Sequence, residues 1–501
     1  MSNILDIITS QKLTYEQKLI SLAHAAEDTQ NVLDIPELTQ YYFDNMAIDD
    51  LFEGNAPYRP RYIMPDYSVF VKNGSEFLGL DAPQDLDELL NSLMIVYRHV
   101  PSITSFPVYL GDLDKLIDPF LDGLDDEVIK KKLRLFLNYL DRTVTDSFCH
   151  ANLGPEETRA GRLILEVEKE LQNAVPNLTL KYDKDLTSDA FAEQGLHTSL
   201  FVANPAFANH KLLKDTYGDV DYGISSCYNI LPTPGGAYTL SRLVLPKMAL
   251  LANDSEDFFN RILPECLEAM GNYMNERVRF LVEESGFFES SFLVKEGLIN
   301  KDNFVGMFGL VGLADGANTL MVKDGKEGRY GNSAEADDLA ERIMEAISDF
   351  AQNFEAVHSP LTNNRFLLHA QVGMDYDEGV TAGVRIPVGD EPKNLSDHLR
   401  HSARFHKLLP TGCSDIFAME STARKNPKAM LDTMSGAFDL GHKYMSFYEE
   451  DGDLIRITGY LVKRSEMEKF KNDEAVLQNT THLGTPNYKH NNLADRKVRG
   501  V

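Results

Sequence analysis

Two long segments of the chain carry apolar residues at helical spacing. In Asp126–Thr143 the apolar positions fall on one face, and Asp126 and Glu127 stand near the positive end of the helix dipole. Ser333–Val357 repeats the pattern, and Ser333 suits an N-cap. Each segment therefore predicts an amphipathic helix with one buried face. The residues on these faces are Ile129, Leu133, Phe136, Leu137 and Leu140, then Leu339, Ile343, Ile347, Phe350 and Phe354.

From Leu178 onward, short β-like runs are separated by helical patterns. Such alternation is typical of an α/β fold. Periodicity alone fits an open sheet and a closed barrel equally well. Pro57–Phe77, with aromatic residues among prolines and arginines, is expected to be a packed loop, and a segment that closes over a substrate is the alternative. The predicted strands are Leu178–Tyr182, His197–Ala203, Phe366–Val372, Val384–Val388 and Leu454–Val462.

The chain is too long for one ordinary core. Its 501 residues predict two or three domains or one large α/β barrel. The formal charge of −28 repels phosphate backbones, so nucleic acids are not expected as partners. No run approaches the ~18 consecutive apolar residues of a membrane span, and Met1–Leu13 lacks the pattern of a secretion signal. A cytoplasmic protein without membrane contact is expected.

The four cysteines are widely spaced. No Cys-x-x-Cys pair occurs among Cys149, Cys227, Cys266 and Cys413, so neither an all-cysteine zinc site nor a cysteine-ligated iron–sulfur cluster is expected. A reducing cytoplasm keeps such thiols free. Three of them are interpreted as small buried hydrophobes. Cys227 alone stands in a polar segment broken by glycine and proline, which is typical of a functional loop.

A glycine near the C-terminus stands in a distinctive setting. Arg456-Ile457-Thr458-Gly459-Tyr460 resembles the R-V-x-G-Y signature of glycyl radical enzymes, in which the glycine loses a hydrogen atom from Cα and stores an unpaired electron. Glycine suits this role because, without a Cβ, its backbone can flatten around a trigonal carbon. Gly500 has a similar setting, but a position next to the chain end is not expected to shield a radical from oxygen. We therefore assign the radical to Gly459.

A second resemblance to the same enzymes surrounds Cys227. The runs Asn204–Asn209 and Asp221–Cys227 look like the P-A-F-x-N … Y-x-I-x-G-C pattern that precedes the radical cysteine. Upstream, Pro176–Tyr182 resembles the strand P-N-L-T-V-R. The resemblance covers about Pro176 to Met467 and is most like the YjjI-type family. Two downstream segments that resemble the helix before the glycine loop are Asn426–Leu431 and Gly436–Tyr444.

The resemblance implies a fold and a domain organisation. The fold is a ten-stranded α/β barrel of two five-stranded halves with helices outside, and the loops of Cys227 and Gly459 meet inside it. Residues 1–175 are expected to form a mainly helical region packed on the barrel. Residues 176–430 then form the barrel core with the cysteine loop, and residues 431–501 form the glycyl radical region.

The resemblance also implies an anaerobic, oxygen-sensitive radical mechanism. The Gly459 radical takes a hydrogen atom from Cys227, in a nearly thermoneutral exchange because thiol S–H and glycyl Cα–H bonds have comparable strengths. The thiyl radical then takes a hydrogen atom from a small polar metabolite, which eliminates a group or breaks a bond. A separate AdoMet-dependent radical activase is the expected partner, with no cofactor or metal bound to this chain. A homodimer is a further expectation.

Next to Cys227 the chain departs from two branches of these enzymes. Branches that dehydrate diols or cleave choline carry a glutamate base where this chain has Asn229, and asparagine accepts no proton at ordinary pH. Ser226 replaces the first cysteine of the Cys-Cys pair in the pyruvate formate-lyase branch, which disfavours acyl transfer. A lyase or dehydratase that draws its base from elsewhere is expected.

Two alternative functions stay open. Phe304–Ala314 looks like the glycine-rich barrel segment shared with anaerobic ribonucleotide reductases, although the zinc cysteines typical of those reductases are absent. No Gly-Lys-Ser/Thr follows these glycines, so close backbone packing is expected in place of a phosphate loop. The other alternative is an inactive or spare-part protein of the radical family.

Several side chains are candidates for proton transfer, and none receives a role from the sequence alone. They lie in or beside segments expected to face the barrel interior, and histidine titrates near neutrality. Arg456 is interpreted as holding the glycine loop through backbone carbonyls, with a surface arginine as the alternative. The polar tail after Asn472 is expected to be a surface extension. The candidates are Glu193, His197, His210, Asp221, Tyr222, His369 and Asp375.

Overall fold

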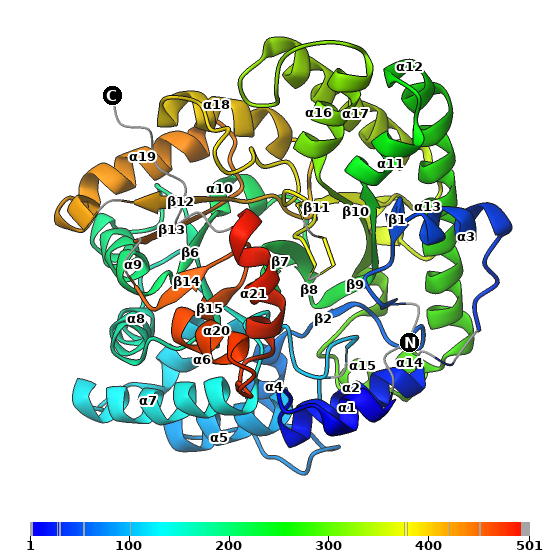
Figure 1. Cartoon of the computed structure of the whole chain (residues 1–501). Helices are drawn as coiled ribbons and strands as arrows, with labels where there is room; N and C mark the ends of the chain where they lie inside the picture. Colours follow the sequence, from blue (N-terminus) through cyan, green and yellow to red (C-terminus); the bar gives the residue numbers. More distant parts are fainter. Residues whose placement is uncertain are drawn as a thin grey trace.

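The fold rests on two sheets that lie at the left and right of Figure 1. The computed structural model describes residues 4–27, 29, 32–53, 56–100, 102–374, 376–377, 379–419, 421–449 and 452–491. In these residues the strands pair into a six-stranded sheet, a five-stranded sheet and two separate hairpins. Hairpin β7–β8 (Asp221–Ser225 and Asn229–Thr233) lies between the sheets, with β7 against β3 and β4 and β8 against β9 and β10.

In the six-stranded sheet neighbouring strands are parallel, apart from the antiparallel pair β13 and β6. In the five-stranded sheet β9, β10 and β11 are parallel, while β1 and β2 pair antiparallel with β9. The first sheet has the order β12 (Asp415–Met419), β13 (Tyr444–Glu449), β6 (Ala206–Asn209), β5 (Asn177–Tyr182), β4 (His150–Leu153) and β3 (Tyr109–Asp112). The second contains β1 (Ile48–Asp49), β2 (Tyr62–Met64), β9 (Gly235–Val244), β10 (Phe304–Val311) and β11 (Leu367–Ala370).

The central strands are buried along their whole length. Every residue of β5, β9 and β10 is buried, as expected for parallel strands that helices cover on the outside. The longer helices are α5 (Leu86–Tyr97), α7 (Asp126–Thr143), α8 (Arg159–Leu171), α9 (Asp189–Val202), α13 (Leu263–Arg279), α16 (Leu313–Lys323), α17 (Ala334–Asn353), α18 (Leu395–His406) and α19 (Pro427–Asp439). Shorter ones are α3 (Glu37–Asp44), α4 (Tyr67–Asn73), α6 (Leu113–Ile117), α10 (His210–Leu213), α11 (Leu245–Leu251), α12 (Ser255–Asp257), α14 (Phe287–Ser290) and α15 (Phe292–Lys295).

The predicted α/β fold with outer helices is confirmed, and the described strands form a six-stranded and a five-stranded sheet where two five-stranded halves were expected. Both amphipathic helices are present, as α7 and α17, and their predicted apolar faces pack into the core. Residues 1–175 contribute β1, β2, β3 and β4 to the two sheets in addition to helices. Among the described residues, none of the helices has the length and hydropathy needed to span a lipid bilayer.

Two of the five predicted strands are wrong. His197–Ala203 is the end of helix α9, whose N-cap Ser188 accepts a hydrogen bond from Phe191 N (3.1 Å) and whose buried residues recur at helical spacing. Val384–Val388 forms no strand, because Pro387 lacks an N–H and Arg385 turns its side chain to Ser414. Pro57–Phe77 is also not a simple loop, since it contains β2 and α4.

The remaining strand predictions hold, one of them with a change. β5 and β11 match two predicted strands. Leu454–Val462 is a hairpin of two short strands, β14 (Leu454–Arg456) and β15 (Leu461–Lys463), with residues 457–460 as its turn. The glycines of Phe304–Ala314 confirm the packing prediction: a Cβ on Gly309 would lie 2.7 Å from Ser241 O, too close for a real side chain.

As far as Asn491, the tail after Asn472 is a packed element instead of a surface extension, and residues 492–501 lie outside the described residues. Helix α21 (Asn479–Asn491) follows α20 (Arg464–Lys471) and runs beside β15 (Figure 1). Thr480 and Thr481 are buried, and a Cβ on Gly484 would lie 2.8 Å from Ile457 Cδ1. Polar composition misled the prediction because small hydroxyl and glycine residues allow this helix to approach the glycine hairpin closely.

Candidate active site

Gly459 lies in the turn of hairpin β14–β15, inside the molecule. Its carbonyl oxygen accepts hydrogen bonds from Asn177 Nδ2 (2.8 Å) and Arg456 Nη1 (3.2 Å). Leu461 N donates to Ser147 Oγ (2.6 Å). Every residue from Leu454 to Val462 is buried, so the turn is fixed and shielded from solvent.

Arg456 ties this hairpin to the six-stranded sheet. Its Nη2 donates to Ala203 O (2.9 Å) and to Asn177 Oδ1 (3.0 Å), while Nε also donates to Ala203 O (3.2 Å). The side chain is fully buried. A planar guanidinium with five donors suits this position, because it can donate hydrogen bonds to several carbonyl groups at once. The interpretation that Arg456 holds the glycine loop through backbone carbonyls is confirmed, and the surface alternative is wrong.

Cys227 occupies the tip of hairpin β7–β8 and lies directly against Gly459. Ser226, the first residue of the turn, has a φ of 55°, which lies in the left-handed region. A Cβ built on Gly459 would lie 2.7 Å from Cys227 Cα and 2.9 Å from Cys227 Sγ. The two loops predicted to meet therefore touch. No side chain larger than that of glycine fits at position 459 without displacing Cys227.

The thiol of Cys227 is buried and keeps its proton. Burial raises its pKa to about 12, although Arg385 and Arg456 oppose the shift. Ionic reactions of cysteine require the thiolate, which is scarce here at neutral pH. Transfer of a hydrogen atom requires the intact S–H bond instead, so this environment suits radical chemistry.

Cys227 also forms part of the wall of a cavity of about 650 Å3. Gly459 is not among the lining residues, so Cys227 separates the glycine from the cavity. Polar groups are numerous in the lining, which suits a polar ligand. Asn229, two residues after the cysteine, is buried there, and its Oδ1 has no hydrogen-bond partner. The polar lining includes Arg61, Tyr62, Asp146, Ser226, Asn229 and Gln371.

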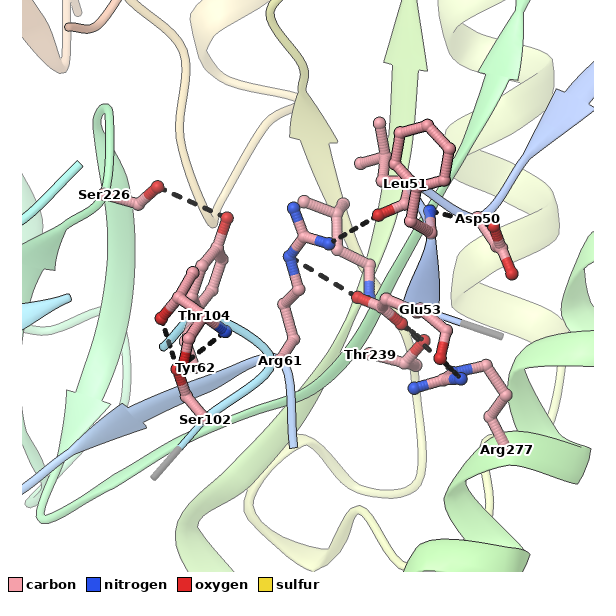
Figure 2. A network of polar contacts seen from close by, with 12 residues as sticks. Asp50, Leu51, Glu53, Arg61, Tyr62, Ser102, Thr104, Ser226, Thr239 and Arg277 are labelled. Carbon is pink, nitrogen blue, oxygen red and sulfur yellow. Dashed lines mark hydrogen bonds and ion pairs between the residues drawn. The ribbon is translucent and has the colours of Figure 1, made fainter. Parts of the chain in front are cut away.

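Figure 2 shows how the N-terminal region reaches this cavity. Tyr62, on β2, accepts a hydrogen bond from Ser226 Oγ (3.3 Å). Arg61 lies between the Tyr62 ring and Glu53, and its Nη1 donates to Leu51 O (3.2 Å). Pro57–Phe77 therefore supplies two residues of the cavity wall. Its aromatic and arginine content was the available signal, and the packed-loop prediction missed it.

The short segment from Thr145 to Phe148 joins the glycine hairpin to the cavity. Ser147 holds Leu461, as described above, and the Phe148 ring packs 5.1 Å from the Tyr460 ring. Asp146, directly before Ser147 in sequence, lines the cavity and accepts a hydrogen bond from Phe148 N (2.9 Å). Burial raises the pKa of Asp146 to about 7, so this carboxyl group can hold or release a proton near neutrality.

Asp146 was not among the candidates chosen from the sequence, and those candidates lie elsewhere. None of the six described candidates lines the cavity. Glu193 and His197 lie on α9, and Asp221 is exposed at the start of β7. His210 Nδ1 and Tyr222 Oη lie 2.9 Å apart, away from the cavity lining. Asp375 lies outside the described residues.

Of the candidates that the structure describes, His369 is the one beside the cavity lining, two residues before Gln371. It is fully buried on β11, and its Nδ1 lies 3.1 Å from Thr411 O. Burial lowers the pKa of His369 to about 3, so the imidazole stays neutral. It packs against the ring of Tyr228, which follows Cys227. These contacts indicate a structural role.

Both ends of the described chain close the cavity. Helix α2 (Tyr15–Glu27), which follows α1 (Ile4–Thr9), contributes His24 and Glu27 to the lining, and Asn479 of α21 contributes from the other end. Gln17 Nε2 joins them by donating to Asn479 Oδ1 (2.8 Å). Among the described residues, no group of three or more His, Cys, Asp and Glu side chains is placed to hold a metal ion.

The sequence as a whole is similar to two bacterial proteins. It is 45% identical to an uncharacterized protein of Haemophilus influenzae, over the full chain and 98% of that protein. It is 40% identical to the uncharacterized protein YjjI of Escherichia coli, over 99% of this chain and 95% of that protein.

Solved structures share the fold at low sequence identity. The anaerobic ribonucleotide reductase of Thermotoga maritima with MES in the active site superposes with a TM-score of 0.71 at 13% identity, over 93% of each chain. A glycyl radical enzyme of Archaeoglobus fulgidus gives a TM-score of 0.65 at 11% identity, over 92% of this chain and 82% of that one. Residues 13–499 match the family described as glycyl radical enzyme YjjI-like. The chain therefore belongs to the YjjI-like family of glycyl radical enzymes.

Proposed function

We propose that the protein is an anaerobic radical enzyme in which Gly459 stores the unpaired electron and Cys227 delivers it to a small polar metabolite. The observation that carries this proposal is the position of Cys227, which touches Gly459 on one side and lines the cavity on the other. A radical held on a buried backbone carbon needs such a relay to reach a substrate.

The reaction proceeds by hydrogen-atom transfers that balance over one turnover. The Gly459 Cα radical takes the hydrogen atom of the Cys227 S–H bond, which gives a glycyl C–H bond and a thiyl radical. The thiyl radical takes a hydrogen atom from a substrate carbon. The substrate radical then loses a neighbouring group or breaks a bond, and the product radical recovers a hydrogen atom from Cys227. Gly459 finally returns its hydrogen atom to the sulfur.

Elimination or bond cleavage, as in lyases and dehydratases, is the favoured outcome. Asn229 takes the place of a glutamate base, and Asp146 supplies a carboxyl group on the same cavity wall. The reaction is proposed to take place in an anaerobic cytoplasm. A separate radical AdoMet activase creates the radical, and this chain needs no cofactor of its own.

Electron paramagnetic resonance after anaerobic activation tests the proposal. We expect a doublet, because one hydrogen atom remains on the radical carbon of Gly459. Gly459→Ala should abolish the doublet, and Gly500→Ala, at the rival glycine, should retain it. If Gly459→Ala fails to fold, incorporation of [2-13C]glycine should broaden the wild-type signal.

A doublet that survives in Gly459→Ala would overturn the assignment. Failure of any radical to form with a competent activase would favour the rival interpretation, an inactive or spare-part protein of the same family.

A further inference from the structure

Arg61 places a cationic group on the wall of the candidate substrate cavity. It stands one residue before strand β2, and its side chain retains 12% of its exposure. Figure 2 shows the guanidinium between the ring of Tyr62 and the carboxylate of Glu53. A charge in this position requires a counter-charge, because burial of an unpaired ion is strongly unfavourable.

The nearest carboxylate neutralises Arg61 only in part. Glu53 Oε1 lies 3.5 Å from Arg61 Nε, while Glu53 Oε2 lies 3.1 Å from the buried Arg277. The same carboxylate also accepts hydrogen bonds from Leu240 N (2.7 Å) and Thr239 Oγ1 (2.5 Å). One carboxylate is thus shared by two guanidinium groups and is directed mainly toward β9 and Arg277.

The other acidic groups that the structure describes in this region do not neutralise Arg61. Asp50 accepts a hydrogen bond from Tyr273 Oη (2.5 Å), and in Figure 2 its carboxylate points away from Arg61. Glu27 is paired with Arg59 (2.6 Å). Asp146, with its raised pKa, is largely neutral below pH 7. Among the described residues, the cavity side of Arg61 therefore carries excess positive charge.

Arg61 also has donors to spare. Within the described residues, its side-chain contacts are the Nη1 bond to Leu51 O, the long ion pair from Nε to Glu53 and an interaction with the Tyr62 hydroxyl. At 3.5 Å, Nε makes no true hydrogen bond. Because arginine has five N–H donors, at least two remain for a ligand. Asn229 and Gln371, both buried in the same wall, add amide groups nearby.

Arg61 and the reactive sulfur of Cys227 belong to the same cavity wall. Arg61 is followed by Tyr62, whose hydroxyl is bonded to Ser226, and Ser226 precedes Cys227. The hydrogen bond between Ser226 and Tyr62 thus connects the segment that carries Arg61 to the loop that carries Cys227.

We propose that this cavity binds a metabolite that carries a carboxylate or phosphate group, with that group on Arg61 and the carbon to be attacked at Cys227. A planar fork of N–H donors recognises either anion through paired hydrogen bonds. This inference rests on the proposed radical function for its reaction, but the binding itself needs no radical.

Isothermal titration calorimetry on the unactivated full-length protein tests the binding. The probes are acetate and inorganic phosphate, with acetamide as the uncharged match of acetate. We expect one or both anions to bind with a Kd on the order of 1 mM, which is typical of so small a ligand, and acetamide to bind more weakly by at least about tenfold. Tighter binding of acetate would indicate a carboxylate substrate, and tighter binding of phosphate would indicate a phosphorylated one.

Two Arg61 variants and one control locate the site. Arg61→Gln should weaken anion binding by at least about tenfold. Arg61→Lys keeps the charge but loses the paired N–H donors of the guanidinium group, so it should retain part of the anion affinity. This second variant tests the site if Arg61→Gln is unstable. Arg261→Gln, at an exposed arginine paired with Asp257 on the surface, should bind as the wild type does.

Unchanged anion affinity in Arg61→Gln, equal affinity for acetate and acetamide, or no anion binding at 50-fold the expected Kd would each overturn the proposal. These outcomes differ from failure of the radical assignment, which is read from the resonance signal of activated protein.

Discussion

The two sides of Cys227 differ in their openness, because one is packed around the buried Gly459 and the other faces a cavity. On the Gly459 side, the glycine carbonyl accepts two hydrogen bonds, and Arg456 and Asn177 bond one another. On the cavity side, Asn229 Oδ1 has no partner and Arg61 retains spare donors. A closed environment keeps a radical carbon away from water and oxygen. A cavity wall with unused hydrogen-bonding groups leaves binding capacity for a ligand, so the contrast separates storage from reaction.

The largest expected effect comes from removing the sulfur that connects the two sides. In D2O the wild-type S–D bond delivers deuterium to Gly459, so the doublet of the activated protein should collapse to a singlet. Cys227→Ser should keep its doublet, because an O–H bond is too strong to exchange. We expect the doublet of Cys227→Ser to collapse at least about 100-fold more slowly than that of the wild type. This factor is equivalent to about 2.7 kcal/mol of added barrier to hydrogen exchange.

Cys413→Ser is the matched control for this measurement, since Cys413 is equally buried but does not line the cavity. It should collapse at the wild-type rate. Collapse at that rate in Cys227→Ser would remove Cys227 from the relay.

A second test loosens the closed side. Arg456→Met leaves Ala203 O and Asn177 Oδ1 without their charged donor, which should lower the free energy of unfolding by about 2–4 kcal/mol. Urea denaturation measures the loss, and hydrogen exchange should speed up in residues 454–463. Arg261→Met, at an exposed arginine, should behave as the wild type. Normal exchange protection in the hairpin of Arg456→Met would show that Arg456 does not hold it.

The smallest effect concerns Asp146 on the open side and depends on pH. Its pKa is about 7 in the folded protein and about 3.9 in an unfolded chain, so the folded state binds more protons between these values. Wild-type stability from this group is therefore greatest at low pH and falls as pH rises toward 7. Asp146→Asn removes this loss and should be more stable than wild type at pH 8, by about 1–3 kcal/mol.

Urea denaturation at pH 8 and pH 4.5 measures the difference between Asp146→Asn and wild type. The difference should shrink at pH 4.5, where the wild-type carboxyl is protonated in the folded state. Asp122→Asn, at an exposed aspartate, should show no such pH dependence. An equal difference at both pH values would mean that Asp146 ionises normally.

The parts of the site that the sequence predicted are those whose chemistry lies in local motifs. Glycine followed by tyrosine after Arg456, and cysteine after Asp221–Ser226, are readable because their neighbours build the two hairpins. The α/β fold was predictable for a similar reason. The residue patterns of β5 and α17 each lie within one short continuous segment of the chain.

The missing parts depend on burial by distant segments. Asp146 stands between a helix and a strand, where aspartate is common in turns. Its raised pKa arises because Gln371 and Asn479, more than 200 residues away, help to enclose the same cavity. Arg61 resembles any arginine of an aromatic loop until Glu53 is found to be shared with Arg277. No local pattern carries that information.

The bond between Gln17 and Asn479 has a consequence for biosynthesis. Gln17 also donates to Val476 O (3.2 Å), so helix α2 is anchored by a residue that is synthesised 459 positions later. The strands of both sheets are complete at Glu449, but the cavity wall beside Cys227 also needs Asn479. A product that stops between these two residues would retain the strands of both sheets and lack this part of the wall, which leaves Cys227 more open to oxygen.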